Sequence, residues 1–325
     1  MSDRPSVSVV IPTKNRWSLA SRTALPSALS QEGIEYEVVI VDDGSTDETA
    51  LGLAELVIRD PRIRVLRHDE SRGVAAARNT GIAAARAPWL AFLDDDDIWS
   101  PRKLTLQLGA ARRTGADWGY AGAVAVSDAG QLLYQYYLPD PACIDAQLRS
   151  AAVVPAGASN VVARTDVVRR AGGFDERFSM LADWDLWIRL AEKSEPVALH
   201  EVHVAVLFHP HSGHAVTDQS AELERLIDKC AARTPPVLLD VDVLGHARWV
   251  ASEHSRAGRH LRAAWLYARD AWRYRSPSNM LRAADALLGK KPGSFVAARD
   301  DSPVPPAPEA MPSWLGRSVY LDLPG

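Results

Sequence analysis

Short apolar runs alternate with longer amphipathic stretches over the first 125 residues of the chain. An apolar run of four to eight residues is typical of a buried strand, and apolar positions three or four apart are typical of a helix. The runs predict strands at Val7–Ile11, Val38–Val41, Arg64–Leu66 and Trp89–Leu93. The amphipathic stretches predict helices at Trp17–Gln31, Asp47–Arg59, Gly73–Arg86 and from Ser100 to about Arg113. Such alternation predicts an α/β fold with a mostly parallel sheet covered by helices.

Two of these helices carry boundary signals. Pro26 lies inside the first helix and predicts a kink there. Ser100 is followed by Pro101, a pair typical of an N-cap and first helical position.

The pattern changes after Trp118, where the regular alternation ends. Strands are predicted at Gly119–Val126, Leu132–Leu138, Val197–Leu199 and Val202–Phe208, and helices at Thr165–Ala171 and Asp183–Glu192. From Glu222 to Lys291 the chain is mostly helical, and Gly258 separates two antiparallel helices. In the second of these, one apolar face is predicted from helical spacing, formed by Leu261, Ala264, Trp265, Ala268 and Trp272.

These changes divide the sequence into three expected parts: an α/β domain over 1–215, a helical extension over 216–298, and a proline-rich linker and tail over 299–325. Among the 325 residues, 37 are basic and 41 acidic, and the net charge of −4 argues against a nucleic-acid partner. The two cysteines exclude a disulfide scaffold or a four-cysteine zinc site. No apolar run approaches membrane-spanning length and the N-terminus does not resemble a signal peptide, so we expect a cytoplasmic protein.

Three polar segments lie where the predicted strands end: Pro12–Arg16, Asp42–Asp47 and Asp94–Asp97. Ligands of open α/β sheets bind at the carboxyl ends of the strands. Four consecutive aspartates repel one another unless a cation or solvent screens them, and carboxylates suit Mg²⁺ or Mn²⁺. The other interpretation is a solvated turn before the next helix. The Asp42–Asp47 loop likewise either offers a carboxylate to a nucleoside or only caps a helix.

Together the three segments resemble family 2 glycosyltransferases of the GT-A fold. The resemblance is carried by VSVVIPTKNR, VVIVDDGSTDET and RGVAAARNTGIAAARAPWLAFLDDDD, and it continues through GGFDERF and ADWDLWIRLA to about residue 211. It implies a Rossmann-like sheet followed here by a helical extension. It also implies metal-dependent, inverting transfer from a nucleotide-diphosphate sugar, with a UDP-sugar favoured. The acceptor would be a glycan, a lipid-linked intermediate or a small molecule.

The resemblance assigns donor-binding roles to the first three segments. Asp43 matches the position that contacts the nucleobase, and the segment with Pro12, Thr13 and Asn15 lines the same pocket. Arg78 is expected to neutralise the diphosphate; the alternative is a surface arginine on an alanine-rich helix.

The acidic run matches the D-x-D motif of this family. Asp96 is expected to bind a Mg²⁺ or Mn²⁺ ion, Asp94 to face the ribose or the metal, and Asp95 to lie between them on the donor side. His209 is the expected third metal ligand, with His211 in reserve; a histidine-rich surface turn is the other interpretation.

Asp183 matches the catalytic base of the family, which takes the proton of the acceptor hydroxyl. Relatives often carry Glu before this aspartate, whereas this chain has Ala182. Asp185 is expected to be structural, and Trp184 and Trp187 to pack in the core rather than stack on a sugar.

The helical extension is basic, with ten basic and three acidic residues between Gly245 and Lys291. Its local charge of +7 leaves −11 for the rest of the chain. Two interpretations stay open: peripheral contact with an anionic membrane, or a basic helix face in solvent. Rivals to the glycosyltransferase hypothesis are a sugar-nucleotide nucleotidyltransferase, which normally has a glycine-rich loop after the first strand, and a non-catalytic nucleotide-sugar binding protein.

Overall fold

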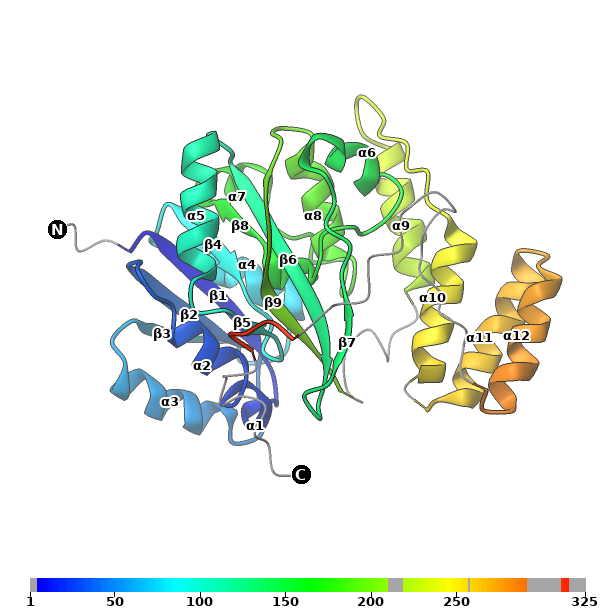
Figure 1. Ribbon diagram of the computed structural model, residues 1–325, viewed down its shortest axis with the longest axis horizontal. Helices are drawn as coiled ribbons and strands as arrows, with labels where there is room; N and C mark the ends of the chain where they lie inside the picture. The colour runs from blue at the N-terminus through cyan, green and yellow to red at the C-terminus, as the bar shows by residue number, and fades with distance from the viewer. Residues whose placement is uncertain (1–4, 210–218, 257, 291–310, 316–325) are drawn as a thin grey trace. The chain divides into compact units, whose positions relative to one another are not determined.

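The structure is a computed structural model that describes residues 5–209, 219–256, 258–290 and 311–315 (Figure 1). It divides into two compact units. The first holds the chain up to Phe208, except Arg149–Ala151, and takes up the described tail segment Met311–Leu315. The second holds Arg149–Ala151 and the chain from His209 onward through the last helices. The contacts thus change at Phe208, whereas the sequence pattern placed the division at residue 215.

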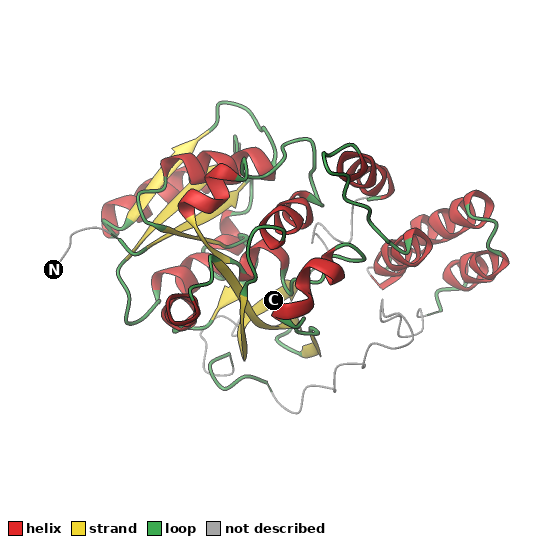
Figure 2. Cartoon of the chain, turned by 90° about the horizontal axis from the view of Figure 1, so that it is seen from above, coloured by secondary structure: helices red, strands yellow, loops and turns green. Residues whose placement is uncertain are grey.

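The first unit is built on one mixed sheet with the strand order β3-β2-β1-β4-β8-β6-β9-β5, and β7 pairs with β6. Strands β3, β2, β1 and β4 are mutually parallel, and β8 runs antiparallel to its two neighbours. Helices flank the sheet (Figure 2), which confirms the predicted α/β class. The strands are β1 Val7–Thr13, β2 Tyr36–Asp42, β3 Ile63–Arg67, β4 Trp89–Phe92, β5 Ile98–Trp99, β6 Trp118–Ser127, β7 Leu132–Gln135, β8 Val162–Arg164 and β9 Val197–Phe208.

Register explains why the polar segments meet at one edge of this sheet. Every residue of β1 and β2 is buried, as their apolar sequences demand. Thr13 pairs with Asp42 at the end of these strands, and the Asp43 N–H donates to the Thr13 carbonyl at 2.9 Å. Val10 pairs with Phe92, so β4 ends at the same edge and delivers the aspartate run there. The carboxyl ends of three adjacent parallel strands therefore carry all three acidic or polar loops.

The helices of the first unit follow the predicted order with two corrections. The first expected helix is two short ones, and the break lies at residues 21–23 rather than at Pro26. Pro26 is the third residue of its helix, where its missing N–H has no intrahelical partner to lose. The helices are α1 Trp17–Ala20, α2 Ala24–Leu29, α3 Thr49–Arg59, α4 Val74–Ala84, α5 Lys103–Thr114, α6 Ile144–Leu148, α7 Thr165–Arg170 and α8 Ala182–Ala191, with 3₁₀ turns at Pro141–Cys143 and Gly157–Asn160.

Ser100 does not cap α5, which begins at Lys103 after Arg102. Its hydroxyl is instead paired with Nδ1 of His203 on β9 at 2.7 Å. A second difference concerns β9. It is one continuous strand where the sequence predicted two, and its pairing with β6 shifts register near Gly122. Both differences involve neighbours that are distant along the chain.

The second unit is all helical in its described part. It contains α9 Ser220–Ala231, α10 Val243–Arg256, α11 His260–Arg273 and α12 Pro277–Leu287. Gly258 has a φ of +73° between α10 and α11, as expected for the residue that ends a helix. The apolar face predicted on α11 is buried only in part: Ala264 is buried, but the other buried apolar positions are Ala263, Leu266, Tyr267 and Ala271. Leu261, Trp265 and Trp272 are exposed instead.

Part of the expected linker and tail packs on the first unit. Leu315 is fully buried beside Ile98 and Val124, and Trp314 donates its indole N–H to the Val202 carbonyl at 2.9 Å. Throughout the described ranges, every helix is too short or too polar to cross a lipid bilayer.

Candidate active site

Asp43 lies at the end of β2 with its carboxylate fully engaged by the following loop. Oδ1 accepts from the Arg72 N–H at 2.8 Å and is paired with His68 Nδ1 at 2.7 Å. Oδ2 accepts from the Ser71 hydroxyl at 2.7 Å and the Gly73 N–H at 2.9 Å. A carboxylate has about four acceptor positions, so all are filled. Burial opposes ionisation, but these hydrogen bonds outweigh it and lower the pKa of Asp43 to about 2.

Asn15 closes the same loop from the β1 side. Its backbone has a φ of 53°, and its side-chain oxygen accepts from the Thr46 N–H at 2.7 Å. Its own N–H donates to the Ser45 hydroxyl at 2.9 Å. Pro12 is buried in β1, whereas Asn15 is exposed. The structure thus brings the 12–15 and 42–47 segments into direct contact, as the sequence predicted.

Asp95 and Asp96 are tied to the loop after β1. The Thr13 hydroxyl donates to Asp95 at 2.7 Å, and one Arg16 nitrogen reaches Asp95 at 3.0 Å and Asp96 at 2.9 Å. Asp95 is buried, and this burial together with the Asp96 charge raises its pKa to about 7 despite Arg16. Arg16 is the last residue of the Pro12–Arg16 segment, but the sequence predicted no individual role for it.

Arg78 is not a surface arginine. It is buried on α4, forms an ion pair with Asp94, and lies over the Phe174 ring at 5.2 Å. Burial would lower its pKa, but the charges of Asp94 and Asp183 raise it. The Nε atom of Arg78 is buried without a hydrogen-bond partner. The structure therefore places a guanidinium between two predicted site carboxylates.

The 3₁₀ turn Gly157–Asn160 is the part of the site that sequence reasoning missed. The Ser159 hydroxyl accepts from the Asp94 N–H at 3.0 Å and also bonds the Asp97 carboxylate. Burial and the neighbouring carboxylates Asp96 and Asp94 nevertheless raise the pKa of Asp97 well above its usual range. In the sequence this turn is marked only by small residues around Gly157, and such a run matches no recognisable motif.

Asp183 occupies the first turn of α8, half-buried. Its Oδ1 accepts from the Trp184 N–H at 2.7 Å. Gly157 has a φ of +49°, and a Cβ there would lie 2.4 Å from Asp183 Oδ2, so a side chain would be strained and would displace this carboxylate. Asp183 is thus held between a helix N-terminus and a backbone that approaches closely.

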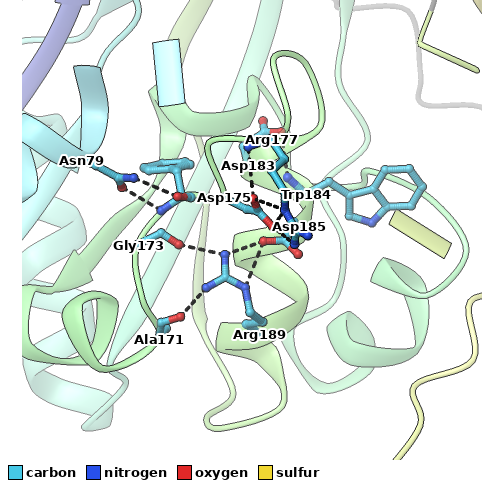
Figure 3. Close-up of polar contacts among 10 residues, drawn as sticks. Asn79, Ala171, Gly173, Asp175, Arg177, Asp183, Trp184, Asp185 and Arg189 are labelled. Atoms are coloured by element: carbon cyan, nitrogen blue, oxygen red, sulfur yellow. Dashed lines mark hydrogen bonds and ion pairs between the residues drawn. The ribbon is translucent and has the colours of Figure 1, made fainter. Parts of the chain in front are cut away.

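The loop before α8 is fixed by two clamps (Figure 3). Asn79 donates to the Phe174 carbonyl at 2.8 Å and accepts from its N–H at 2.9 Å. Arg189 pairs with buried Asp185 and donates to the Gly173 carbonyl at 2.8 Å. These contacts agree with the structural role expected for Asp185.

Trp184 and Trp187 lie in the core, as predicted. Each is 1% exposed; Trp184 donates to the Leu148 carbonyl at 2.7 Å, and Trp187 stacks on Trp118 with ring centroids 6.1 Å apart. Figure 3 shows the Trp184 indole directed away from the Asp185–Arg189 pair. Neither ring is available for a sugar.

The expected metal ligands are only partly brought together. Asp94 and Asp96 lie on one loop, whereas His209 belongs to the second unit, and His211 lies outside the described residues. Within the ranges that the structure describes, no three His, Cys, Asp or Glu side chains are grouped to hold an ion. Two carboxylates nevertheless suit Mg²⁺, which normally completes its shell with water and substrate phosphate.

Comparison with known proteins agrees with this geometry. The family model described as Glycosyl transferase family 2 matches residues 8–150. Over 132 residues the chain is 40% identical to the succinoglycan biosynthesis protein ExoO of Rhizobium meliloti, which covers 41% of this chain and 37% of that protein. Over 114 residues it is 33% identical to an Escherichia coli protein named UDP-Glc:alpha-D-GlcNAc-diphosphoundecaprenol beta-1,3-glucosyltransferase WfgD, with 35% and 44% covered. The matched part therefore spans less than half of either relative.

A crystal structure of S. aureus TarS 1-349 in complex with UDP-GlcNAc is similar in fold, with a TM-score of 0.57 and 14% identity. The likeness covers 88% of this chain and 92% of that one, and it confirms the expected GT-A architecture with a helical C-terminal part. Residues 8–150 of this chain are therefore a family 2 glycosyltransferase domain.

Proposed function

We propose that this protein transfers a sugar from a nucleotide-diphosphate sugar, with a UDP-sugar favoured, to an acceptor hydroxyl with inversion at the anomeric carbon. One observation carries the proposal. The buried guanidinium of Arg78 forms an ion pair with Asp94 and interacts electrostatically with Asp183 at one edge of the sheet. A cation for the leaving diphosphate and a carboxylate for the acceptor proton are thereby neighbours.

Asp183 is the base of the proposed reaction. As the acceptor oxygen bonds to the anomeric carbon, its proton passes to the Asp183 carboxylate, and the bond to the diphosphate breaks on the opposite face. A general base of this kind contributes roughly 10²–10⁴-fold in rate. The Trp184 N–H and the close backbone at Gly157 hold the carboxylate in a fixed orientation.

Arg78 and the acidic run serve the donor. We expect Arg78 to neutralise phosphate charge, because a guanidinium matches the geometry of phosphate oxygens. Asp94 and Asp96 would hold Mg²⁺ or Mn²⁺, because burial and the neighbouring carboxylates raise the pKa of Asp95 and Asp97, and a cation would offset the repulsion within this run. The bound ion would stabilise the charge that develops on the diphosphate. A role for His209 in this site stays a prediction.

The acceptor we propose is a growing glycan or a lipid-linked sugar. Two relatives are named for succinoglycan biosynthesis and for a diphosphoundecaprenol-linked substrate, which supports this choice over a small molecule. The fold neighbours solved with UDP-GlcNAc and with UDP support a uridine nucleotide in the donor.

Substitution of Asp183 by Asn tests the proposal. We expect UDP release from a panel of UDP-sugars with Mn²⁺ and acceptor to fall about 10²–10⁴-fold, with UDP affinity unchanged. Asp166→Asn, at an exposed position of α7, is the matched control and should retain full turnover. Full turnover by Asp183→Asn would refute the assignment of Asp183 as the base. Equal turnover of the unmodified chain in Mn²⁺ and in EDTA would refute the metal requirement.

A further inference from the structure

Helix α11 exposes an apolar stripe. Leu261, Trp265 and Trp272 are 80%, 50% and 86% exposed. Their spacing of four and seven residues places them on one side of the helix, opposite the side buried against α10 and α12. Two exposed tryptophans on one helix are far more apolar surface than a solvated face requires.

Arginines border this stripe along the same helix. Arg262 and Arg269 lie over the Trp265 ring, with guanidinium carbons 4.6 Å and 5.3 Å from its centroid. Arg273 forms an ion pair with Glu224, and Arg262 is exposed. The stripe is therefore flanked by cations that are already stacked on its aromatic ring.

Helix α12 and the residue after it also expose large apolar side chains. Met280, Leu281, Leu287 and Leu288 are each more than half exposed. From Arg259 to Lys290 the chain has seven basic and two acidic residues, and one of the acidic ones, Asp270, is buried. We call this exposed surface of α11 and α12 the Trp–Arg face.

We propose that the Trp–Arg face docks on the surface of an anionic lipid bilayer. Tryptophan and leucine side chains would enter the headgroup boundary, and the arginines would lie among lipid phosphates, which is how amphipathic helices bind membranes. A second copy of this chain is the weaker occupant, because the stretch from Arg259 to Lys290 has a net positive charge and two such stretches would repel one another. The proposal does not depend on glycosyl transfer.

Vesicle co-sedimentation of the full chain tests it. We expect binding to vesicles of phosphatidylcholine with phosphatidylglycerol, and none to phosphatidylcholine alone. Trp265→Ala with Trp272→Ala should weaken binding at least about tenfold, and Arg262→Glu about fivefold or more, whereas Arg262→Lys should bind normally.

Matched controls come from the first unit. Ile58 is as exposed as Trp272, at 86%, and Arg112 is an exposed arginine on α5. Ile58→Ala and Arg112→Glu should leave vesicle binding unchanged. Equal losses in these controls would show that the Trp–Arg face has no special role.

Two further outcomes would overturn the proposal. One is equal recovery on neutral and anionic vesicles. The other is a dimer in light scattering that the tryptophan substitutions dissociate, without vesicle binding. Should the double variant fail to fold by circular dichroism, the unmodified chain still decides, because its binding must fall steeply as salt rises.

Discussion

Two acidic loops at the same edge of the sheet differ in how their charge is satisfied. At the end of β2, Asp43 receives hydrogen bonds at all four acceptor positions, and its pKa falls to about 2. After β4, burial and mutual repulsion raise the pKa of Asp95 and Asp97. The Asp43 carboxylate is therefore satisfied by hydrogen bonds within the protein, whereas the carboxyl groups after β4 are buried close together and ionise less readily.

This contrast separates two uses of a buried carboxylate. Asp43 holds the 68–73 loop in place, so we expect it to shape the nucleotide pocket through that loop. Asp94 and Asp96 are held by Arg78 and Arg16, which balance only part of the acidic run. A divalent cation would add positive charge beside these carboxylates, and the oxygens of a donor diphosphate would complete its coordination.

The largest effect is expected at the acidic run after β4. Asp96→Asn should weaken Mn²⁺-dependent UDP binding about 100-fold, because one of two proposed ligands is lost. Calorimetric titration of UDP with Mn²⁺ and with EDTA measures this. Asp43→Asn serves as the comparison and should keep the ratio of UDP affinity with Mn²⁺ to UDP affinity with EDTA. If Asp96→Asn also kept this ratio, the two loops would not differ in metal binding.

A smaller effect is expected at the completed loop. Asp43→Asn should lower the free energy of unfolding at pH 7 by about 2 kcal/mol, the value of the pKa depression. Because the folded pKa lies below the unfolded one, this stability is present above about pH 4 and is lost as pH falls toward 2. Urea unfolding from pH 2 to 7 measures it. A variant with the same pH profile as the unmodified chain would contradict the assigned hydrogen bonds.

The smallest effect has the opposite sign. Asp97→Asn should raise the free energy of unfolding by about 1 kcal/mol at pH 7 without metal. The folded pKa of Asp97 is raised, so the folded chain binds the extra proton and the carboxyl destabilises increasingly as pH rises above about 4. Unfolding in urea with EDTA should show this gain, and a loss of stability would mean that Asp97 is satisfied like Asp43.

Local sequence pattern predicted what local physics determines. The apolar runs of β1, β2 and β4 are buried on both faces, and turn residues end them, so the strands and their acidic loops were recognisable. The Gly157–Asn160 turn was not, because its role comes from distant partners such as Asp94 and Asp183. For the same reason Ser100, which bonds His203, was mistaken for a cap.

Helix α11 shows a different limit. Its spacing predicted one apolar face that includes Leu261, Trp265 and Trp272, but the spacing did not say whether that face is buried. The structure buries small residues such as Ala263 and Ala271 instead, because α10, α11 and α12 pack closely. Periodicity identified the helix but could not choose between its faces.

Arg78 and Asn79 are consecutive residues of α4 with different tasks. Arg78 interacts with Asp94, and Asn79 clamps the loop that leads to α8 and its Asp183. A chimaera that takes the segment from Gly172 to α8 from a relative, but keeps α4 of this chain, would therefore separate the new loop from the Asn79 that should hold it. Such a graft needs α4 to travel with the segment from Gly172 to α8, so the two halves of the site are one unit for engineering.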